Sequence, residues 1–281
     1  MLTETLQSIP AAARSVFHNW RPMLVITLVY AAFLAAIYSF LAVREASMWQ
    51  VVATFALAVA VPLLFFLLQA LITTDAAANQ TLGSFLMRSL ANLLKILLIS
   101  LPLIALAVLV IYLLAKAQAR LGSSLTEALD EIPRRLSGAA ARPPARPVDW
   151  KYAFVATLRY LALGLFLPLA AIHLWLSTSK DGLITTIKRI GSIMARAFAP
   201  RSVFIYIVGF IVFAVVPYFL LLRTIPSKHA WLELVLFVAR LVVVFALTLF
   251  GWVITVKALG TADEPQVVPL GTEINAAGET I

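Results

Sequence analysis

The chain has 281 residues, of which 62% are hydrophobic and only 12% are charged, and its mean hydropathy is +0.98. A water-soluble domain cannot bury that much apolar surface, so the composition excludes an ordinary soluble fold and indicates a lipid-embedded one. The formal net charge of +9 does not require a nucleic-acid partner, because Lys and Arg collect beside anionic lipid headgroups in membrane proteins.

Six apolar runs are long enough to cross about 30 Å of hydrocarbon, which takes roughly 20 helical residues. They are Met23–Val43, Val51–Ile72, Ile96–Leu114, Phe154–Leu176, Val203–Leu222 and Leu234–Val256, and none contains Asp or Glu. Each must be a helix, because lipid offers the backbone no other hydrogen-bond partner. The sequence therefore predicts an all-α, polytopic transmembrane helical bundle formed by one membrane domain over residues 1–259.

Tryptophan and proline are placed as in membrane helices. An aromatic belt at the two interfaces is expected from residues at or near the ends of the runs, namely Trp20, Trp49, Trp150, Trp175, Trp231 and Trp252. Four of the runs contain a proline, namely Pro62, Pro102, Pro168 and Pro217. These prolines either kink the spans and shape a cavity or only reflect the higher frequency of proline in membrane helices.

Two segments lie outside the spans. The loop 115–149 begins with a predicted short helix, GSSLTEALDEIPRRL, and continues as a Pro/Ala/Arg-rich linker. The tail 260–281 is polar and acidic, and we expect it to be disordered.

A basic amphipathic stretch precedes the first, third and fifth spans. The three stretches are SIPAAARSVFHNWRP, GSFLMRSLANLLK and GLITTIKRIGSIMARAFAPR. Their apolar residues recur every three or four positions opposite their cations, which predicts helices lying flat at the headgroup boundary. In the third stretch we expect contacts with anionic lipid headgroups from Lys188, Arg189, Arg196 and Arg201.

This threefold pattern resembles a group of bacterial six-span membrane proteins. The resemblance lies in ARSVFHNWRPMLVITLVY and MARAFAPRSVFIYIVGF, in which a short basic-aromatic helix leads directly into a span. The group includes proteins similar to the membrane domain of glycerophosphoryl diester phosphodiesterases. The resemblance covers most of the chain as architecture, and it carries over no active-site residue.

The distribution of cations sets the expected orientation. With the amino terminus inside, the short inner segments are more basic than the short outer ones, whereas the long loop adds cations to the outside. The three surface helices would then all face the anionic cytoplasmic leaflet. We therefore expect a bacterial inner-membrane protein with both termini in the cytoplasm.

The search for catalytic groups points away from an enzyme. His18, His173 and His229 are scattered, and neither a zinc-binding helix motif nor a phosphate-binding loop occurs. We therefore expect no catalytic residue, no cofactor and no metal. The absence of cysteine also excludes a thiol nucleophile.

A few polar residues lie within the spans. Arg240 is a costly charge in a membrane helix, so it either snorkels to the interface or forms a polar site with Tyr38, Ser39 or Tyr218. For Gln69 we expect an ordinary interhelical hydrogen bond.

The favoured function is a non-catalytic scaffold whose partners are the bilayer, anionic lipid headgroups and another membrane protein. The alternative is a transporter or lipid-handling permease with a cavity lined by proline-kinked spans. The sequence gives no substrate, no named partner and no oligomeric state.

Overall fold

The computed structural model describes residues 9–16, 20–43, 47–74, 81–121, 150–222 and 230–262. In these ranges the regular elements are all helical. Six helical runs are long and apolar enough to cross a membrane, namely Trp20–Ala42, Met48–Thr73, Leu82–Ala119, Ala153–Asp181, Pro200–Leu222 and Trp231–Thr261. The predicted all-α fold with six spans is confirmed.

Residues 9–16 form a short helix ahead of the first span. The labelled elements are α2 (Trp20–Ala42), α3 (Met48–Thr73), α4 (Leu82–Leu121), α6 (Trp150–Leu161), η1 (Ala162–Phe166), α7 (Leu167–Asp181), α8 (Leu183–Lys188), α9 (Ile190–Ala197), α10 (Pro200–Phe210), η2 (Ile211–Val215), α11 (Val216–Leu222) and α12 (Ala230–Ala262). The fourth span is thus α6–η1–α7, and the fifth is α10–η2–α11.

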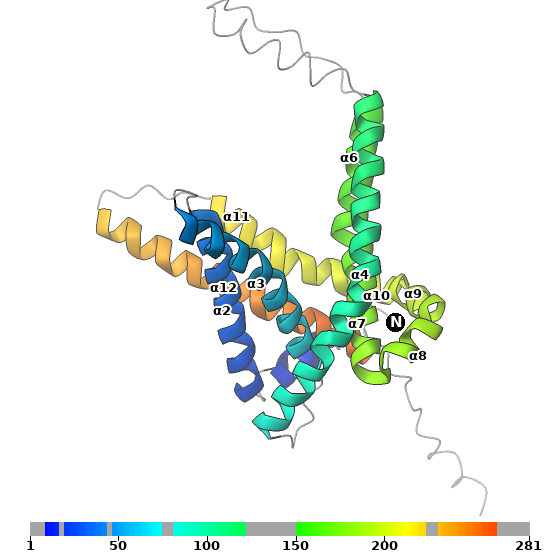
Figure 1. Cartoon of the computed structure of the whole chain (residues 1–281), viewed down its shortest axis with the longest axis horizontal. Coiled ribbons are helices and arrows are strands. Elements are labelled where there is room, and N and C mark those ends of the chain that lie inside the picture. Colours follow the sequence, from blue (N-terminus) through cyan, green and yellow to red (C-terminus); the bar gives the residue numbers. More distant parts are fainter. Residues whose placement is uncertain are drawn as a thin grey trace, which may run out of the picture.

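The six spans pair in chain order as three hairpins: α2 with α3, α4 with the fourth span, and the fifth span with α12. Figure 1 shows α4 and α6 rising as an upright pair, while α11 and α12 extend to the left. The hairpins meet where α3, α7 and α12 contact one another. We call the region where they meet the packed end, and the region where they diverge the splayed end.

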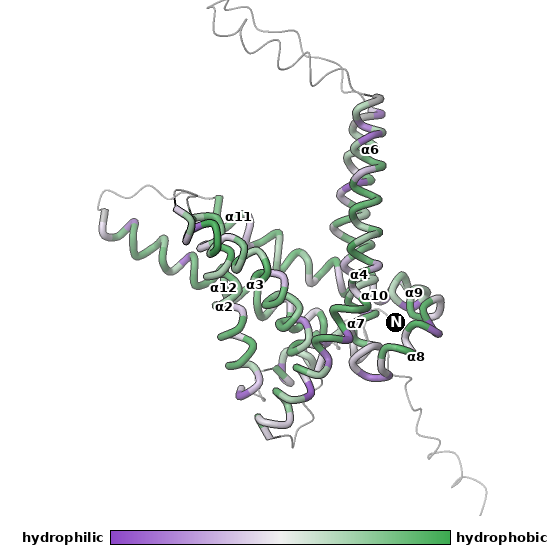
Figure 2. The backbone as a smooth tube through the Cα atoms, in the orientation of Figure 1, coloured by the Kyte–Doolittle hydropathy of each residue, from purple (hydrophilic) through white to green (hydrophobic). Residues whose placement is uncertain are grey.

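The hydrophobic core lies at the packed end. It contains the last two turns of α3, most of α7, the final turns of α12 and one face of the first half of α4, with further buried residues from α2, α9, α10 and the helix 9–16. Figure 2 shows that the helices are apolar toward both ends, so burial does not simply follow hydropathy. In a lipid-embedded bundle the apolar surface at the splayed end faces hydrocarbon rather than water.

Two of the four prolines follow a π-helical segment. η1 ends two residues before Pro168, and η2 ends two residues before Pro217. Proline lacks an N–H and its ring crowds the carbonyl four residues earlier, which favours a wider turn ahead of it. Pro62 and Pro102 lie inside continuous α-helices. Of the two alternatives that the sequence left open for the prolines, distortion of the helix applies to Pro168 and Pro217 in the fourth and fifth spans.

The stretch before the third span is not a separate surface helix. Residues 83–95 form the first part of α4, which is one unbroken helix of 40 residues. One side of this stretch is buried at Phe85, Ser89 and Asn92, while Leu86 and Leu90 on the other side are exposed. Tertiary contacts of the buried side hold the segment in line with the span, which the amphipathic pattern alone did not reveal.

The stretch before the fifth span is helical but broken. It forms α8 and α9, which are separated at Arg189. Gly182 joins α7 to α8 with φ +85° and ψ 165°, a backbone conformation that is accessible essentially to glycine alone.

Several helices extend beyond the predicted spans, and two of them enter segments predicted to be non-helical. The helix of the third span continues to Leu121, into the predicted loop, and α12 continues to Ala262, into the predicted tail. The predicted helix within the loop and the rest of the tail lie outside the described residues.

Candidate functional site

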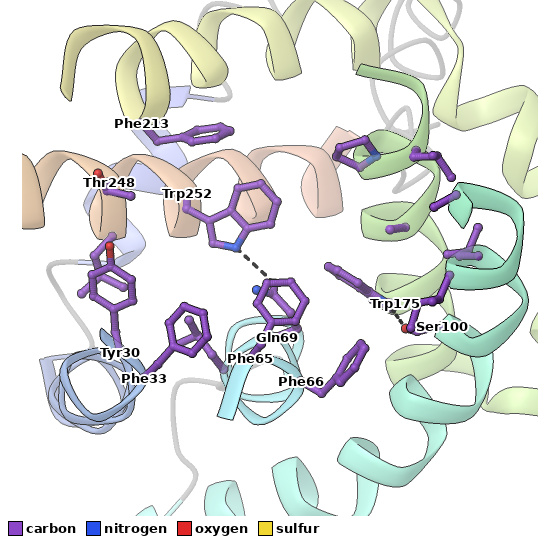
Figure 3. Close-up of a pocket in the computed structure, with 18 of the residues that line it drawn as sticks. Tyr30, Phe33, Phe65, Phe66, Gln69, Ser100, Trp175, Phe213, Thr248 and Trp252 are labelled. Atoms are coloured by element: carbon purple, nitrogen blue, oxygen red, sulfur yellow. Dashed lines mark hydrogen bonds between the residues drawn. The ribbon is translucent and has the colours of Figure 1, made fainter. Parts of the chain in front are cut away.

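A cavity of about 500 Å³ lies between the hairpins, and residues of all six spans line it (Figure 3). Eight of its lining side chains are aromatic, namely Tyr30, Phe33, Phe65, Phe66, Trp175, Tyr206, Phe213 and Trp252. None of the residues that line it is charged. We call this space the central cavity.

The polar atoms around the central cavity bond to one another. Trp252 donates its indole N–H to Gln69 Oε1 at 3.1 Å, and Trp175 donates to Ser100 Oγ at 2.8 Å, as Figure 3 shows. Ser100 in turn donates to the carbonyl of Ile96 at 2.7 Å. Because these groups satisfy each other, the cavity presents an almost wholly apolar wall.

These contacts show that two tryptophans do not lie where the sequence predicted. Trp175 and Trp252 were predicted to belong to an interfacial belt, but both line the central cavity. Trp175 is buried, and each indole N–H bonds to a side chain of another helix. The interhelical hydrogen bond expected for Gln69 is present.

One hydrogen bond connects the cavity wall to the distorted fourth span. Tyr206 of α10 donates its hydroxyl to the carbonyl of Gly164 in η1 at 2.9 Å. Gly164 lies four residues before Pro168, so its carbonyl would accept the N–H that proline lacks. A neighbouring helix thus supplies the missing donor, as apolar surroundings require.

Close helix packing sets the position of Phe213 and Trp252. A Cβ added to Gly251 would lie 2.9 Å from Cβ of Phe213, and a Cβ added to Gly209 would overlap the side chain of Thr255. The two glycines therefore allow α12 to approach the fifth span closely. The rings of Phe213 and Trp252 meet edge to face, with their centroids 5.1 Å apart.

A second cavity of about 310 Å³ lies at the packed end. Three cations line it, one each from α7, α10 and α12: Lys180, Arg201 and Lys257. Lys180 Nζ donates to the carbonyl of Gly260 at 3.4 Å, and Lys257 Nζ donates to Ser15 Oγ at the same distance. No Asp or Glu is among the residues that line it. We call this space the basic cavity.

The residues predicted as an intramembrane polar site lie elsewhere. Tyr38 and Tyr218 are exposed, whereas Ser39 and Arg240 are half-buried. None of the four lines either cavity. Their proposed role as a site stays a prediction.

The residues predicted to contact anionic lipid fall into two groups. Lys188, Arg189 and Arg196 are exposed on or beside α8 and α9. Arg201 instead lines the basic cavity.

The sequence offered a cavity lined by proline-kinked spans as one alternative, and Pro168 does line the central cavity, but the other residues that line the two cavities were not predicted as cavity residues. The central cavity is assembled from six helices, and hydropathy does not say which faces of these helices meet. One signal of close packing was present in the sequence, because Gly209 on α10 and Gly251 and Thr255 on α12 are the kinds of residue that let membrane helices approach closely. The basic cavity was not predicted because Lys180, Arg201 and Lys257 are far apart in the chain. Taken one at a time, each is an ordinary basic residue near the end of a span.

Within the described ranges, no group of three or more potential metal-binding side chains occurs. The fold and the six apolar spans define a multi-pass, all-α integral membrane protein. Comparisons with family models, with curated proteins and with solved structures found no match to this chain.

Proposed function

We propose that this membrane protein binds an apolar or amphipathic molecule of the bilayer in its central cavity, and so acts as a lipid-handling protein. The observation that carries the proposal is the aromatic cavity whose wall contains residues of every span. This is the alternative that the sequence left beside a scaffold.

The chemistry of the wall supports an apolar ligand over a polar solute. A polar solute would lose its hydration on entry, and the Trp252–Gln69 and Trp175–Ser100 pairs already use the polar groups that would replace water. An alkyl chain has no such requirement and gains contact with aromatic rings. The volume of about 500 Å³ is in the range of small-molecule sites.

A cavity-filling substitution tests this proposal. Ala107 of α4 lines the central cavity, so Ala107→Phe should occupy part of it and weaken saturable binding of dioctanoylglycerol by the purified full chain. Ala105→Phe is the matched control, because residue 105 lies on the same helix, is exposed and does not line the cavity. Binding is measured in neutral detergent by titration with the radiolabelled lipid. Equal binding by the wild type and Ala107→Phe would rule out the central cavity as the ligand site.

We further propose that the protein resides in a bacterial inner membrane with both termini in the cytoplasm, which would place the basic cavity beside the anionic leaflet. The chain contains no cysteine, so single cysteines report topology directly. Ser137→Cys should react with an impermeant maleimide added from outside, whereas Ser8→Cys and Thr272→Cys should react only after lysis. The reverse pattern would overturn the orientation.

The scaffold role is a second candidate, and a different region supports it. In the upright pair, α4 and α6 contact each other, and Leu109, Leu113 and Phe154 are exposed along it. Such a two-helix surface suits another membrane helix. A photoreactive benzophenone residue in place of Leu109 should then cross-link to a partner in native membranes on irradiation, whereas the same residue in place of Ala53 in α3 should not. The lack of any cross-linked species at Leu109 would count against the scaffold.

A further inference from the structure

The basic cavity lies directly beyond the central cavity along three helices. On α3, Gln69 lines the central cavity and Thr73 lines the basic one; on α12 the corresponding residues are Trp252 and Val256. In both cases the separation is four residues, about 6 Å along a helix. On α7, the consecutive residues Trp175 and Leu176 line the central and the basic cavity respectively. An apolar space and a cationic space are thus neighbours, about one helical turn apart along α3 and α12.

Arg201 supplies the second observation that points to a ligand. Its side chain lines the basic cavity, and its Nε atom is buried without a hydrogen-bond partner among the described residues. A buried donor on a charged group is costly unless an acceptor meets it. Guanidinium groups bind phosphate oxygens particularly well, because their planar array of donors matches the oxygens of the anion.

The hydroxyl groups in the wall of the basic cavity are already used as donors. Thr73, Thr74 and Thr261 line the cavity, but each donates its hydroxyl hydrogen to a backbone carbonyl three or four residues earlier, so recognition of an oxyanion falls to the cations. Thr74 Oγ1 accepts from Asn92 Nδ2 at 3.3 Å, and Asn92 Oδ1 accepts from Lys95 Nζ at 3.3 Å. A fourth cation, Lys95, is therefore connected to Thr74 in the cavity wall through Asn92.

We infer that the basic cavity binds a phosphate group, and that this phosphate belongs to an amphiphile whose apolar chain lies in the central cavity. This inference rests on the proposed function and deepens it, since it assigns the ligand to phosphate-bearing lipids. Free phosphate has the same recognition chemistry, so the test must separate the two sources.

The experiment compares two lipids with identical chains. Dioctanoyl phosphatidic acid and dioctanoylglycerol are titrated into the full chain in neutral detergent. The phosphate-bearing lipid should bind more tightly, and Arg201→Gln should weaken its binding by about tenfold or more, as expected for losing a charge-assisted hydrogen bond. Binding of dioctanoylglycerol should not change in Arg201→Gln, which also shows that the variant is folded.

Arg88→Gln is the matched control. Arg88 is exposed on α4 and lies outside the basic cavity, so this substitution removes one guanidinium charge without altering the cavity. It should leave the affinity for phosphatidic acid within about twofold, because an exposed charge in high dielectric contributes little. An equal loss in Arg88→Gln and Arg201→Gln would indicate diffuse surface attraction and overturn the inference.

A second variant guards against misfolding. Should Arg201→Gln lose dioctanoylglycerol binding as well, Lys257→Gln serves in its place, since Lys257 lines the same cavity from another helix. Inorganic phosphate is then added as a competitor. Competition at millimolar concentration without any advantage for the lipid identifies free phosphate as the ligand, and poor competition identifies the lipid headgroup.

The outcomes separate the two proposals. If Ala107→Phe blocks dioctanoylglycerol but both Arg201→Gln and Lys257→Gln bind phosphatidic acid like the wild type, the lipid site stands and the phosphate assignment fails. If Arg201→Gln weakens phosphatidic acid while Ala107→Phe affects neither lipid, the phosphate site stands and the central cavity is not a ligand site.

Discussion

The packed end and the splayed end are built from the same helices, yet they bury very different fractions of their side chains. On α12, Val253 and Leu259 are fully buried, whereas Trp231 is 67% and Val242 is 63% exposed. All four are large and apolar. Hydropathy therefore places a helix in the membrane without saying which part of it packs against protein.

The two ends differ instead in small and hydrogen-bonding residues. Gly251 and Thr255 lie at the packed end of α12, and Gln69 and Thr73 lie at that end of α3. In lipid, helices gain little from hiding apolar surface, so close contact and interhelical hydrogen bonds decide where they meet. The predictions below test whether stability is concentrated at the packed end.

The largest effect is expected at Gly251. Leucine at this position would force α12 away from Phe213, whose Cα lies only 3.3 Å from the ideal Cβ position. We expect Gly251→Leu to lower the free energy of unfolding by about 3 kcal/mol, the upper range for overpacking. The measurement is reversible unfolding in mixed micelles.

Gly191→Leu is the control for this prediction, because nothing lies within 4 Å of a Cβ built at Gly191. Its effect should stay within about 1 kcal/mol, the helix-propensity range. Similar losses in both variants would mean that α12 does not depend on close approach to the fifth span.

An intermediate effect is expected at Tyr206. Tyr206→Phe leaves the carbonyl of the partly buried Gly164 without the donor from α10, and an unsatisfied polar group away from water costs about 1–2 kcal/mol. The loss should shrink in a Pro168→Ala background, because alanine restores the backbone N–H that can reach this carbonyl. A double-mutant cycle of unfolding free energies measures the coupling. A cost that is identical in both backgrounds would disprove the link between Tyr206 and the proline.

The smallest effect is expected at Val242. This side chain is 63% exposed at the splayed end, so Val242→Ala should change the free energy of unfolding by no more than about 0.5 kcal/mol, as for a surface position. Asn92→Leu at the packed end is the comparison, since Asn92 is buried and donates to Thr74. A larger loss at Val242 than at Asn92 would show that stability is not concentrated at the packed end.

Much of the fold followed from the sequence because crossing a bilayer imposes a simple length rule. The six spans start and end within several residues of their predicted limits in five cases. The exception is the third span, where residues 83–95 have the spacing of a surface helix but continue into α4. Local periodicity shows that one side of a helix is apolar, and it does not distinguish a lipid surface from a protein neighbour.

The candidate site was far less predictable. Trp175 and Trp252 sit near span ends, where tryptophan favours the interface, and only the relative rotation of α7 and α12 turns them into the cavity. Arg201 was singled out as a headgroup contact, but its grouping with Lys180 and Lys257 depends on three helices that are distant in sequence. Contacts of this kind arise from tertiary packing, which a single sequence does not display.

The π segments give the fourth and fifth spans a property that uniform α-helices lack. Each widened turn holds one residue more than an α-turn, so the residues after it are rotated by about 100° relative to an uninterrupted helix. In α7 this rotation determines that Ala171 and Trp175 face the cavity. If η1 straightened into an α-helix with all its residues kept, these side chains would turn away from the cavity, whereas the additional deletion of one residue would bring them back. For the shape of the cavity, the length of these spans thus carries as much information as their composition.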